Sequence, residues 1–318
     1  MLKNIISITE YNATHNIIRL FGLKIKFTKR EFVKVQKQFP YETYKKNNVP
    51  ITTIPPAEGQ LRDIQLANLA LLREMDYVCK QNNLKYWIDF GTLLGAVRHK
   101  GFIPWDDDVD LGMLREDYDK LIAAFNRSCR NLDIFADFVI CANKPCQSII
   151  KIQHKKCPHL FVDIFPYDNY GQIIPKDLQV AESTKIKNLR EVMQKDCPKK
   201  ALIPEILSIV NKNRKNILNI PHEDCDYIWG IDFNHHWKNW FASKEMLFPL
   251  KEIEFENNLF PCINNIEGYL EKVYGNYMDY PKKFGYGHNM FAKLTQEELT
   301  IVKELRSECE KSFNIRNI

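Results

Sequence analysis

The chain has 318 residues, of which 45% are hydrophobic and 27% are charged. This length and composition suit one large folded domain with an elaboration, and they exclude a largely disordered chain. There are 45 lysine and arginine residues against 40 aspartate and glutamate residues, which gives a net charge of +5. Such a small excess disfavours nucleic acid as a partner, but it suits an anionic substrate or a membrane surface.

Nine cysteines are scattered along the chain without a CxxC pair, and the first fifteen residues lack the apolar segment of a signal peptide. We therefore expect reduced thiols in a cytoplasmic protein, mostly buried as small apolar groups. A zinc site made of Cys141, Cys146, Cys157 and His159 is disfavoured, because the spacing follows no standard zinc pattern. No apolar run reaches the roughly 18–20 residues needed to span a bilayer.

The segment over residues 16–30 mixes large apolar residues with lysine and arginine. It can lie in a membrane interface with its lysines near anionic headgroups, or it can form an edge hairpin or short helix with its lysines in solvent. Proline and asparagine mark residues 40–58 as a linker. We therefore predict an N-terminal segment and linker over residues 1–60, and a catalytic domain with a C-terminal helical elaboration over residues 61–318.

Hydrophobic periodicity and turn residues predict the elements of the larger part. In chain order they are a helix over 62–81, a strand over 85–90, a helix over 92–99, a strand over 108–113 and a helix over 116–129. Strands follow over 148–153 and 160–165, and helices over 176–195, 204–218, 267–274 and 295–313. The order predicts an α/β (α+β) fold in which a small mixed sheet is surrounded by helices.

Four aspartates lie within five consecutive positions at the start of the second predicted strand. Alternation along a strand would place Asp106, Asp108 and Asp110 on one face, with Val109 toward a core. Asp107 has the parity of the core face and is expected to turn to solvent or to cap the strand entrance. Aligned carboxylates repel one another unless a hard cation binds between them, which favours Mg²⁺ or Mn²⁺; the alternative is a solvated acidic turn.

Gly91 and Thr92 follow the first predicted strand and open a helix. Glycine lets a phosphate approach the backbone, and the free N–H groups of a helix N-terminus bind anions. Arg98, about two turns further along, could reach a phosphate with both arms of its guanidinium group. Each signal alone also suits an ordinary turn or a surface salt bridge. Strand, Gly-Thr, helix and Asp-x-Asp in this order predict a phosphate cradle opposite a metal pair, as phosphoryl transfer requires.

Asp163 supplies a third carboxylate from a neighbouring strand. It stands between Val162 and Ile164 in an apolar stretch, where an aspartate is costly unless it is paired or bound to a metal. It is therefore predicted to be a metal ligand, or the base that accepts the proton of an acceptor hydroxyl. A structural hydrogen-bonding role is the alternative.

These motifs resemble those of the LicD family, which includes bacterial phosphocholine transferases and the fukutin-related proteins. The resemblance covers roughly residues 62–281 and is most specific in its central block. The matching residues are Trp87, Asp89, Gly91–Arg98, Ile103–Leu111, Asp117, Tyr118, Val162–Pro166, Phe248–Lys251, Phe255, Glu256, Tyr269, Leu270 and Tyr274–Tyr277. One departure is Asn257, which stands where family members have glycine after Phe-Glu.

The resemblance implies a nucleotidyltransferase-type fold and an enzyme that moves phosphocholine, or a related polyol phosphate, from a CDP-linked donor to a sugar hydroxyl. The acceptor would be a cell-surface glycan of the lipopolysaccharide, capsule or teichoic acid type, including lipid-linked forms. The resemblance assigns metal binding to Asp108 and Asp110, with Asp106 and Asp163 completing the acidic site. It places Gly91, Thr92 and Arg98 near the donor phosphates. The N-terminal segment would hold this cytoplasmic enzyme at the inner face of the cell membrane.

Two alternatives to this function remain open. A nucleotidyltransferase that attaches the nucleoside monophosphate itself would use the same acids, and a non-catalytic module of surface-glycan assembly would retain them as a relic. In the C-terminal half, residues 235–240 could contact a sugar or a choline-like head, although core packing of the tryptophans is favoured. Residues 280–289 form a basic and aromatic loop that either closes over the phosphates or stays a plain surface loop.

Overall fold

The computed structural model describes residues 6–12, 15–20, 23–28, 41–141, 144–196, 203–218, 223–230, 241–285 and 292–316. The chain divides into two compact units, Met1–Ile54 and Pro55–Ile318. The sequence predicts a boundary a few residues later, after residue 60.

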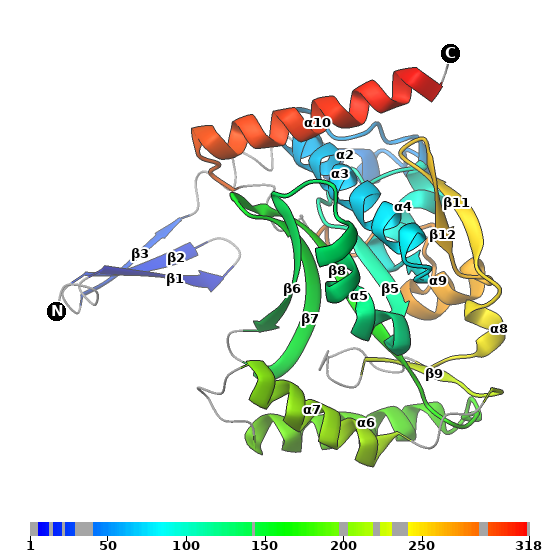
Figure 1. The fold of residues 1–318 in the computed structure, drawn as a ribbon. Helices are drawn as coiled ribbons and strands as arrows, with labels where there is room; N and C mark the ends of the chain where they lie inside the picture. Colours follow the sequence, from blue (N-terminus) through cyan, green and yellow to red (C-terminus); the bar gives the residue numbers. More distant parts are fainter. Residues whose placement is uncertain are drawn as a thin grey trace. The chain divides into compact units, whose positions relative to one another are not determined.

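The first unit contains a three-stranded antiparallel sheet in the order β1-β2-β3 (Figure 1). The strands are β1 (Ile6–Asn12), β2 (His15–Leu20) and β3 (Leu23–Thr28). The stretch predicted as an interface segment or a hairpin thus contains the antiparallel pair β2–β3, while membrane contact stays a prediction. The stretch predicted as a linker contains helix α2 (Tyr41–Lys46) and the short 3-10 helix η1 (Ile51–Thr53).

The second unit is built around a mixed sheet, as predicted, with β8 at its centre. The strands are β4 (Tyr86–Ile88), β5 (Asp110–Leu114), β6 (Ile134–Cys141), β7 (Lys144–His154), β8 (Cys157–Asn169), β9 (Tyr227–Trp229) and β10 (Phe241–Ala242). β8 pairs in parallel with β5 and antiparallel with β7 and β9. β4 extends the sheet beyond β5, β6 beyond β7, and β10 beyond β9, all antiparallel.

The register of this sheet brings charged residues of three strands into one row. Asp110 on β5 is the Cα partner of Asp163 on β8, and Asp163 is in turn the partner of Lys151 on β7. Directly paired residues on neighbouring strands project from the same face. The parallel pairing of β5 and β8 therefore places Asp110 beside Asp163.

 Asp110 and Asp163 are distant in the sequence, so their proximity depends on this strand pairing.

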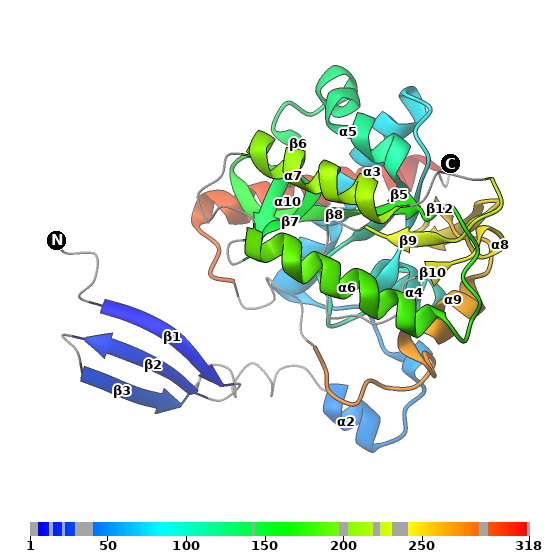
Figure 2. The same ribbon diagram turned by 90° about the horizontal axis from the view of Figure 1, so that it is seen from below.

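Helices cover both faces of the sheet in the second unit. Figures 1 and 2 show α3 beside α10 on one side, and α6 with α7 on the other. The helices are α3 (Gly59–Gln81), α4 (Phe90–His99), α5 (Arg115–Ser128), α6 (Gln179–Asp196), α7 (Ile203–Ile217), α8 (Lys244–Leu247), α9 (Ile266–Tyr274) and α10 (Gln296–Arg316). A separate hairpin joins β11 (Lys251–Phe255) to β12 (Asn258–Cys262). Among the described residues, none of the helices combines the length and apolar composition needed to cross a bilayer.

Local sequence signals explain where two of these helices lie. The predicted apolar stripe of α3, including Ile64, Leu71 and Met75, is completely buried, as expected for a helix that packs on a sheet. A capping box begins α10. The Thr295 amide donates to Glu298 Oε2 at 2.7 Å, and the Glu298 amide donates to Thr295 Oγ1 at 3.2 Å.

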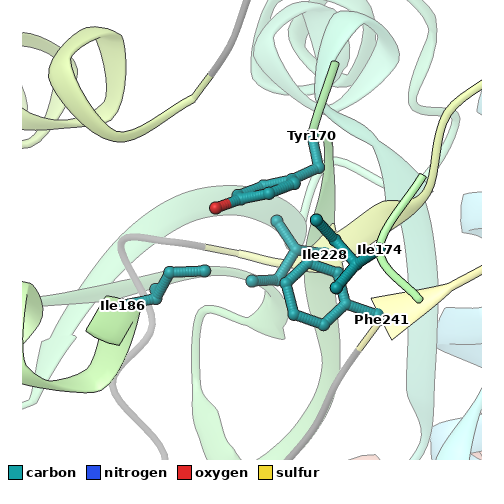
Figure 3. Close-up of a cluster of buried hydrophobic side chains, with 5 residues drawn as sticks. All are labelled: Tyr170, Ile174, Ile186, Ile228 and Phe241. Atoms are coloured by element: carbon teal, nitrogen blue, oxygen red, sulfur yellow. The ribbon is translucent and has the colours of Figure 1, made fainter. Parts of the chain in front are cut away.

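A small apolar cluster holds α6 against the end of the sheet (Figure 3). It consists of Tyr170, Ile174, Ile186, Ile228 and Phe241, each less than 9% exposed.

 Ile186 comes from α6, Ile228 from β9 and Phe241 from β10. Tyr170 also donates its hydroxyl to Glu182 on α6. These contacts hold the first half of α6 against β9 and β10.

Candidate active site

The three aspartates before β5 converge, but not for the reason that the sequence suggests. β5 begins only at Asp110, so Asp106, Asp107 and Asp108 lie in an irregular segment, which we call the acidic loop. The prediction that strand alternation aligns Asp106 and Asp108 is therefore wrong. The loop instead turns so that one carboxylate oxygen from each of its three aspartates lies within 4.8 Å of the others.

Asp107 also differs from its prediction. It was expected to turn to solvent or to cap the strand, but its exposed fraction is 0%. The Asp107 carbonyl accepts a hydrogen bond of 2.6 Å from Asn68 Nδ2, which draws this residue into the interior. Asp107 therefore joins Asp106 and Asp108 as a candidate metal ligand.

Asp110 and Asp163 form the second part of the site. They are paired positions on the parallel strands β5 and β8, and the Asp163 amide donates to the Val109 carbonyl at 2.8 Å. This hydrogen bond closes the end of the strand pair next to the acidic loop. The structure thus brings Asp110 and Asp163 together, as predicted from the sequence.

The charges of these carboxylates perturb one another. Burial raises the pKa of Asp110 well above its usual value, and the negative charges of Asp108 and Asp163 raise it further. Burial likewise raises the pKa of Asp106, with further contributions from the charge of Asp108 and a hydrogen bond to it. Crowded carboxylates of this kind suit a hard divalent cation, which takes oxygen ligands and removes the repulsion.

Gly91 and Thr92 lie against these acids. A Cβ atom at Gly91 would stand 3.3 Å from Asp106 Oδ2 and 3.8 Å from Asp110 Oδ2, so glycine leaves room beside both carboxylates. The Gly91 amide donates to the Asp110 carboxylate, which lowers the pKa of Asp110 against the larger effect of burial. The Thr92 hydroxyl accepts the Asp110 amide at 2.8 Å. Both residues therefore orient Asp110, and their predicted contact with donor phosphates stays a prediction.

Arg98 lies at the other end of α4. It is 7% exposed, and its guanidinium group donates to the Asp279 carbonyl at 2.9 Å. Burial lowers the pKa of Arg98 to about 10. With a rise of about 1.5 Å per residue, its Cα lies roughly 12 Å along the helix axis from Phe90 at the helix start. The structure therefore places Arg98 beside the segment that follows α9, and its predicted contact with donor phosphates stays a prediction.

Asp89 is a buried acid to which the sequence analysis assigned no role. Its carboxylate accepts hydrogen bonds from the Phe90 amide at 2.9 Å, from the Tyr167 hydroxyl at 2.7 Å and from the Tyr269 hydroxyl. Burial raises the pKa of Asp89 to about 6, against the effect of these hydrogen bonds. Its amide donates to the Asp110 carbonyl at 2.9 Å, so Asp89 joins the start of α4 to the start of β5. In the sequence, its position directly after the apolar strand Tyr86–Ile88 is the one local sign that this acid is buried.

Phe90 begins α4 with a φ of +39°, a value that L-residues rarely adopt. Its ring packs against Phe165 and Trp229, with centroid separations of 5.4 and 5.2 Å, and those two rings are 5.3 Å apart. This aromatic trio holds the strained residue in place and forms an apolar wall next to the acids. The backbone turn at Phe90 is what aims the N-terminus of α4 at Asp110.

Lys151 and Tyr274 are further residues near the acids, and the sequence predicts no role in the site for either of them. Lys151 Nζ lies 2.7 Å from Asp163 Oδ1 and 3.8 Å from the centroid of the Phe161 ring. Tyr274, at the end of α9, has a pKa raised well above its usual value by burial and by the charges of Asp110 and its neighbouring acids. Lys151 supplies a positive charge and Tyr274 a neutral hydroxyl. Strand parity could have indicated Lys151, whereas only the fold brings Tyr274 here.

Three other sequence predictions have different outcomes. The aromatic motif at 235–240 lies outside the described residues. The loop at 280–289 is described only as far as 285, where the Phe284 ring packs on Trp105 with centroids 4.9 Å apart. Within the described residues, the potential metal-binding group consists of the acidic-loop aspartates and includes neither Cys157 nor His159.

The fold and site define a mixed α/β protein with a carboxylate cluster at the start of a parallel strand pair. Residues 83–198, which include every predicted site residue, match the family model described as LicD/FKTN/FKRP, nucleotidyltransferase domain. Residues 83–198 therefore resemble a LicD-family domain. The relatives LicD and FKRP are transferases of phosphate-containing groups.

Curated relatives extend this match. The chain is 29% identical to the lipopolysaccharide cholinephosphotransferase LicD of Haemophilus influenzae, over 70% of this chain and 92% of that protein. It is 32% identical to the human ribitol 5-phosphate transferase FKRP, over 31% of this chain and 20% of that protein. It is 38% identical to the uncharacterized protein RT0683 of Rickettsia typhi, over 31% of this chain and 33% of that protein. The similarity to LicD thus extends well beyond the family domain.

Proposed function

We propose that this protein is a metal-dependent phosphotransferase that moves phosphocholine or a related polyol phosphate from a CDP-linked donor to a sugar hydroxyl of a cell-surface glycan. The observation that carries the proposal is the convergence of the acidic loop with Asp110 and Asp163 inside a LicD-family domain. The named relatives transfer choline phosphate and ribitol 5-phosphate, respectively. Their common chemistry is the transfer of a phosphate-linked alcohol.

The acid cluster fits Mg²⁺ or Mn²⁺, because its donors are carboxylate oxygens whose mutual repulsion a divalent cation would relieve. Asp108 and Asp110, with Asp163, are the proposed ligands, and Asp106 and Asp107 can contribute from the acidic loop. When bound, the cation would offset the charge of the donor diphosphate and stabilise the departing phosphate.

In the proposed reaction, the acceptor hydroxyl oxygen forms a bond to the distal phosphorus of the donor. The bond between that phosphorus and the bridging oxygen breaks, and CMP leaves with the bonding electrons. A carboxylate takes the hydroxyl proton, for which Asp163 is a candidate. Lys151 pairs with Asp163, while Thr92 and the Gly91 amide hold Asp110 in position.

The test replaces Asp108 or Asp110 with asparagine, which preserves side-chain size and removes the charge. We expect transfer to fall by about 10²–10³-fold or more, because stabilisation of the transferring phosphate is lost. The readout is CMP release from CDP-choline with Mg²⁺ and a glycan acceptor. Asp177→Asn, at an exposed acid before α6, is the matched control and should retain full activity. Full activity in Asp108→Asn or Asp110→Asn would contradict the proposal.

A nucleotidyltransferase is the second candidate, and the description of the matching family domain favours it. Such an enzyme would attach CMP itself to the acceptor, and diphosphate or the alcohol phosphate would leave. Mass spectrometry of the modified acceptor separates the two reactions, because added phosphocholine and added CMP differ in mass. If the protein is instead a non-catalytic assembly module, isothermal titration should detect no binding of Mg²⁺ and CDP.

A further inference from the structure

Helix α3 presents two buried amide side chains to the acidic loop. Gln65 and Asn68 are both 0% exposed, although the face of α3 that surrounds them is otherwise mainly apolar. A buried amide destabilises the fold unless its donors and acceptor find partners. The partners of these two amides are therefore informative.

Both amides donate to backbone carbonyls at the acidic loop. Gln65 Nε2 donates to the Asp106 carbonyl at 2.7 Å, and Asn68 Nδ2 donates to the Asp107 carbonyl at 2.6 Å. Gln65 Nε2 also lies 3.3 Å from the Ile103 carbonyl, just before the loop. The loop backbone is thus held by side chains of a helix that carries no acidic site residue.

Asn68 makes a second hydrogen bond that Gln65 does not share. Its Oδ1 accepts the amide of Phe161 on β8 at 3.0 Å. Phe161 stands two residues before Asp163, and alternation along a strand places both side chains on one face. Asn68 therefore joins the loop that carries Asp106, Asp107 and Asp108 to the strand that carries Asp163.

The chemistry of this bridge requires an amide. The Asp107 carbonyl needs a donor, and the Phe161 amide needs an acceptor. An asparagine supplies both from one short side chain, whereas aspartate supplies only the acceptor and leucine supplies neither. The two partners also fix which way the Asn68 amide is oriented.

We propose that Asn68 is a positioning residue that sets the separation between the acidic loop and Asp163, and so completes the cation site. This inference rests on the proposed metal-dependent function. Residues that orient ligands from outside the coordination sphere typically change metal affinity or activity by about 10–100-fold when they are mutated. Asn68 acts on the ligand carboxylates through the backbone on both sides of the site.

The test measures Mn²⁺ affinity of the full chain by electron paramagnetic resonance, together with kcat and KM for CDP-choline. Asn68→Leu removes both hydrogen bonds, and we expect the Mn²⁺ affinity to fall by about 10-fold or more, with a fall in kcat. Asn68→Asp keeps the acceptor for Phe161 and loses the donor to Asp107, and should weaken Mn²⁺ binding as well. If Asn68→Leu does not fold, Asn68→Asp and Asn68→Ser decide the question.

Leu69→Ala is the control for general loss of stability. Leu69 is a completely buried neighbour on α3, so its truncation should lower the melting temperature. We expect it to leave the Mn²⁺ affinity unchanged. Unchanged Mn²⁺ affinity in folded Asn68 variants would overturn the positioning role, as would an equal loss in Leu69→Ala. Absence of Mn²⁺ binding by the wild-type protein would instead overturn the proposed function.

Discussion

At the residue scale, the aspartates of the site are held in an arrangement that opposes their own ionisation. Asp106 and Asp110 have raised pKa values because they are buried and close to other negative charges. Each raised pKa means that the ionised carboxylate is less stable in the folded protein than in the unfolded chain. We therefore expect these carboxylates to lower the free energy of unfolding of the metal-free protein, as is common for functional sites.

Asp110→Asn should therefore stabilise the metal-free protein. The substitution removes a charge that faces Asp108 and Asp163, while the Gly91 amide keeps an oxygen acceptor. We expect the melting temperature at neutral pH without metal to rise by a few degrees, since 1 kcal/mol corresponds to roughly 2–4 °C for a domain of this size. Added Mg²⁺ should raise the melting temperature of the wild type but not that of Asp110→Asn. A lower melting temperature in metal-free Asp110→Asn would contradict this account of the site.

Asp89 gives a prediction about pH. Its pKa in the folded protein is about 6, against a usual value of 3.8. Because the protonated form of Asp89 is favoured in the folded protein, its contribution to stability is full below about pH 4 and is lost as the pH rises through about 6. The free energy of unfolding of the wild type relative to Asp89→Asn should therefore fall by on the order of 3 kcal/mol between these limits. Urea unfolding of both proteins at several pH values measures this difference, and a constant difference would contradict the prediction.

At the element scale, short tertiary clamps place the acidic loop. The turn between β11 and β12 puts Glu256 and Asn257 at φ values of +49° and +56°. Asparagine tolerates this left-handed region nearly as glycine does, which explains how Asn257 can stand where family members have glycine. Glu256 reaches across to Arg62 on α3 with hydrogen bonds of 2.8 and 2.6 Å, and it accepts the Phe102 amide at 3.1 Å.

Glu256→Gln should weaken this clamp. It keeps an acceptor for Phe102 but loses the charge that faces Arg62, so we expect the free energy of unfolding to fall by about 1–2 kcal/mol. Chemical denaturation measures the loss. Glu254→Gln, on the same hairpin, is the control, because the Lys100–Glu254 pair is solvent-exposed and should contribute less than about 1 kcal/mol. Equal losses in both variants would show that the Arg62–Glu256 pair has no special role.

The sequence predicts the elements of this region better than it predicts the geometry of the site. Local patterns indicate α3, β4, α5 and the acids, because periodicity and capping are properties of neighbouring residues. They place Asp106 and Asp108 on a strand that in fact starts at Asp110. The loop geometry depends on Gln65, Asn68 and Glu256, which are distant in sequence, so no local pattern could reveal it.

At the scale of the whole molecule, the mixed sheet surrounded by helices follows from the order of elements in the sequence. The pairing of the strands does not follow from this order, because α5, β6 and β7 lie between β5 and β8 in the sequence although β5 and β8 are paired. That pair brings Asp110 next to Asp163, and β7 adds Lys151. The proposed metal site therefore depends on the tertiary fold of the second unit, which brings these three strands together.

The most direct test of the central claim is the mass of the product formed from CDP-choline or CDP-ribitol with Mg²⁺ and a glycan acceptor. The proposal predicts release of CMP and an acceptor that gains the alcohol phosphate, with loss of both when EDTA removes the cation. An acceptor that gains CMP, or transfer that continues unchanged in EDTA, would contradict it.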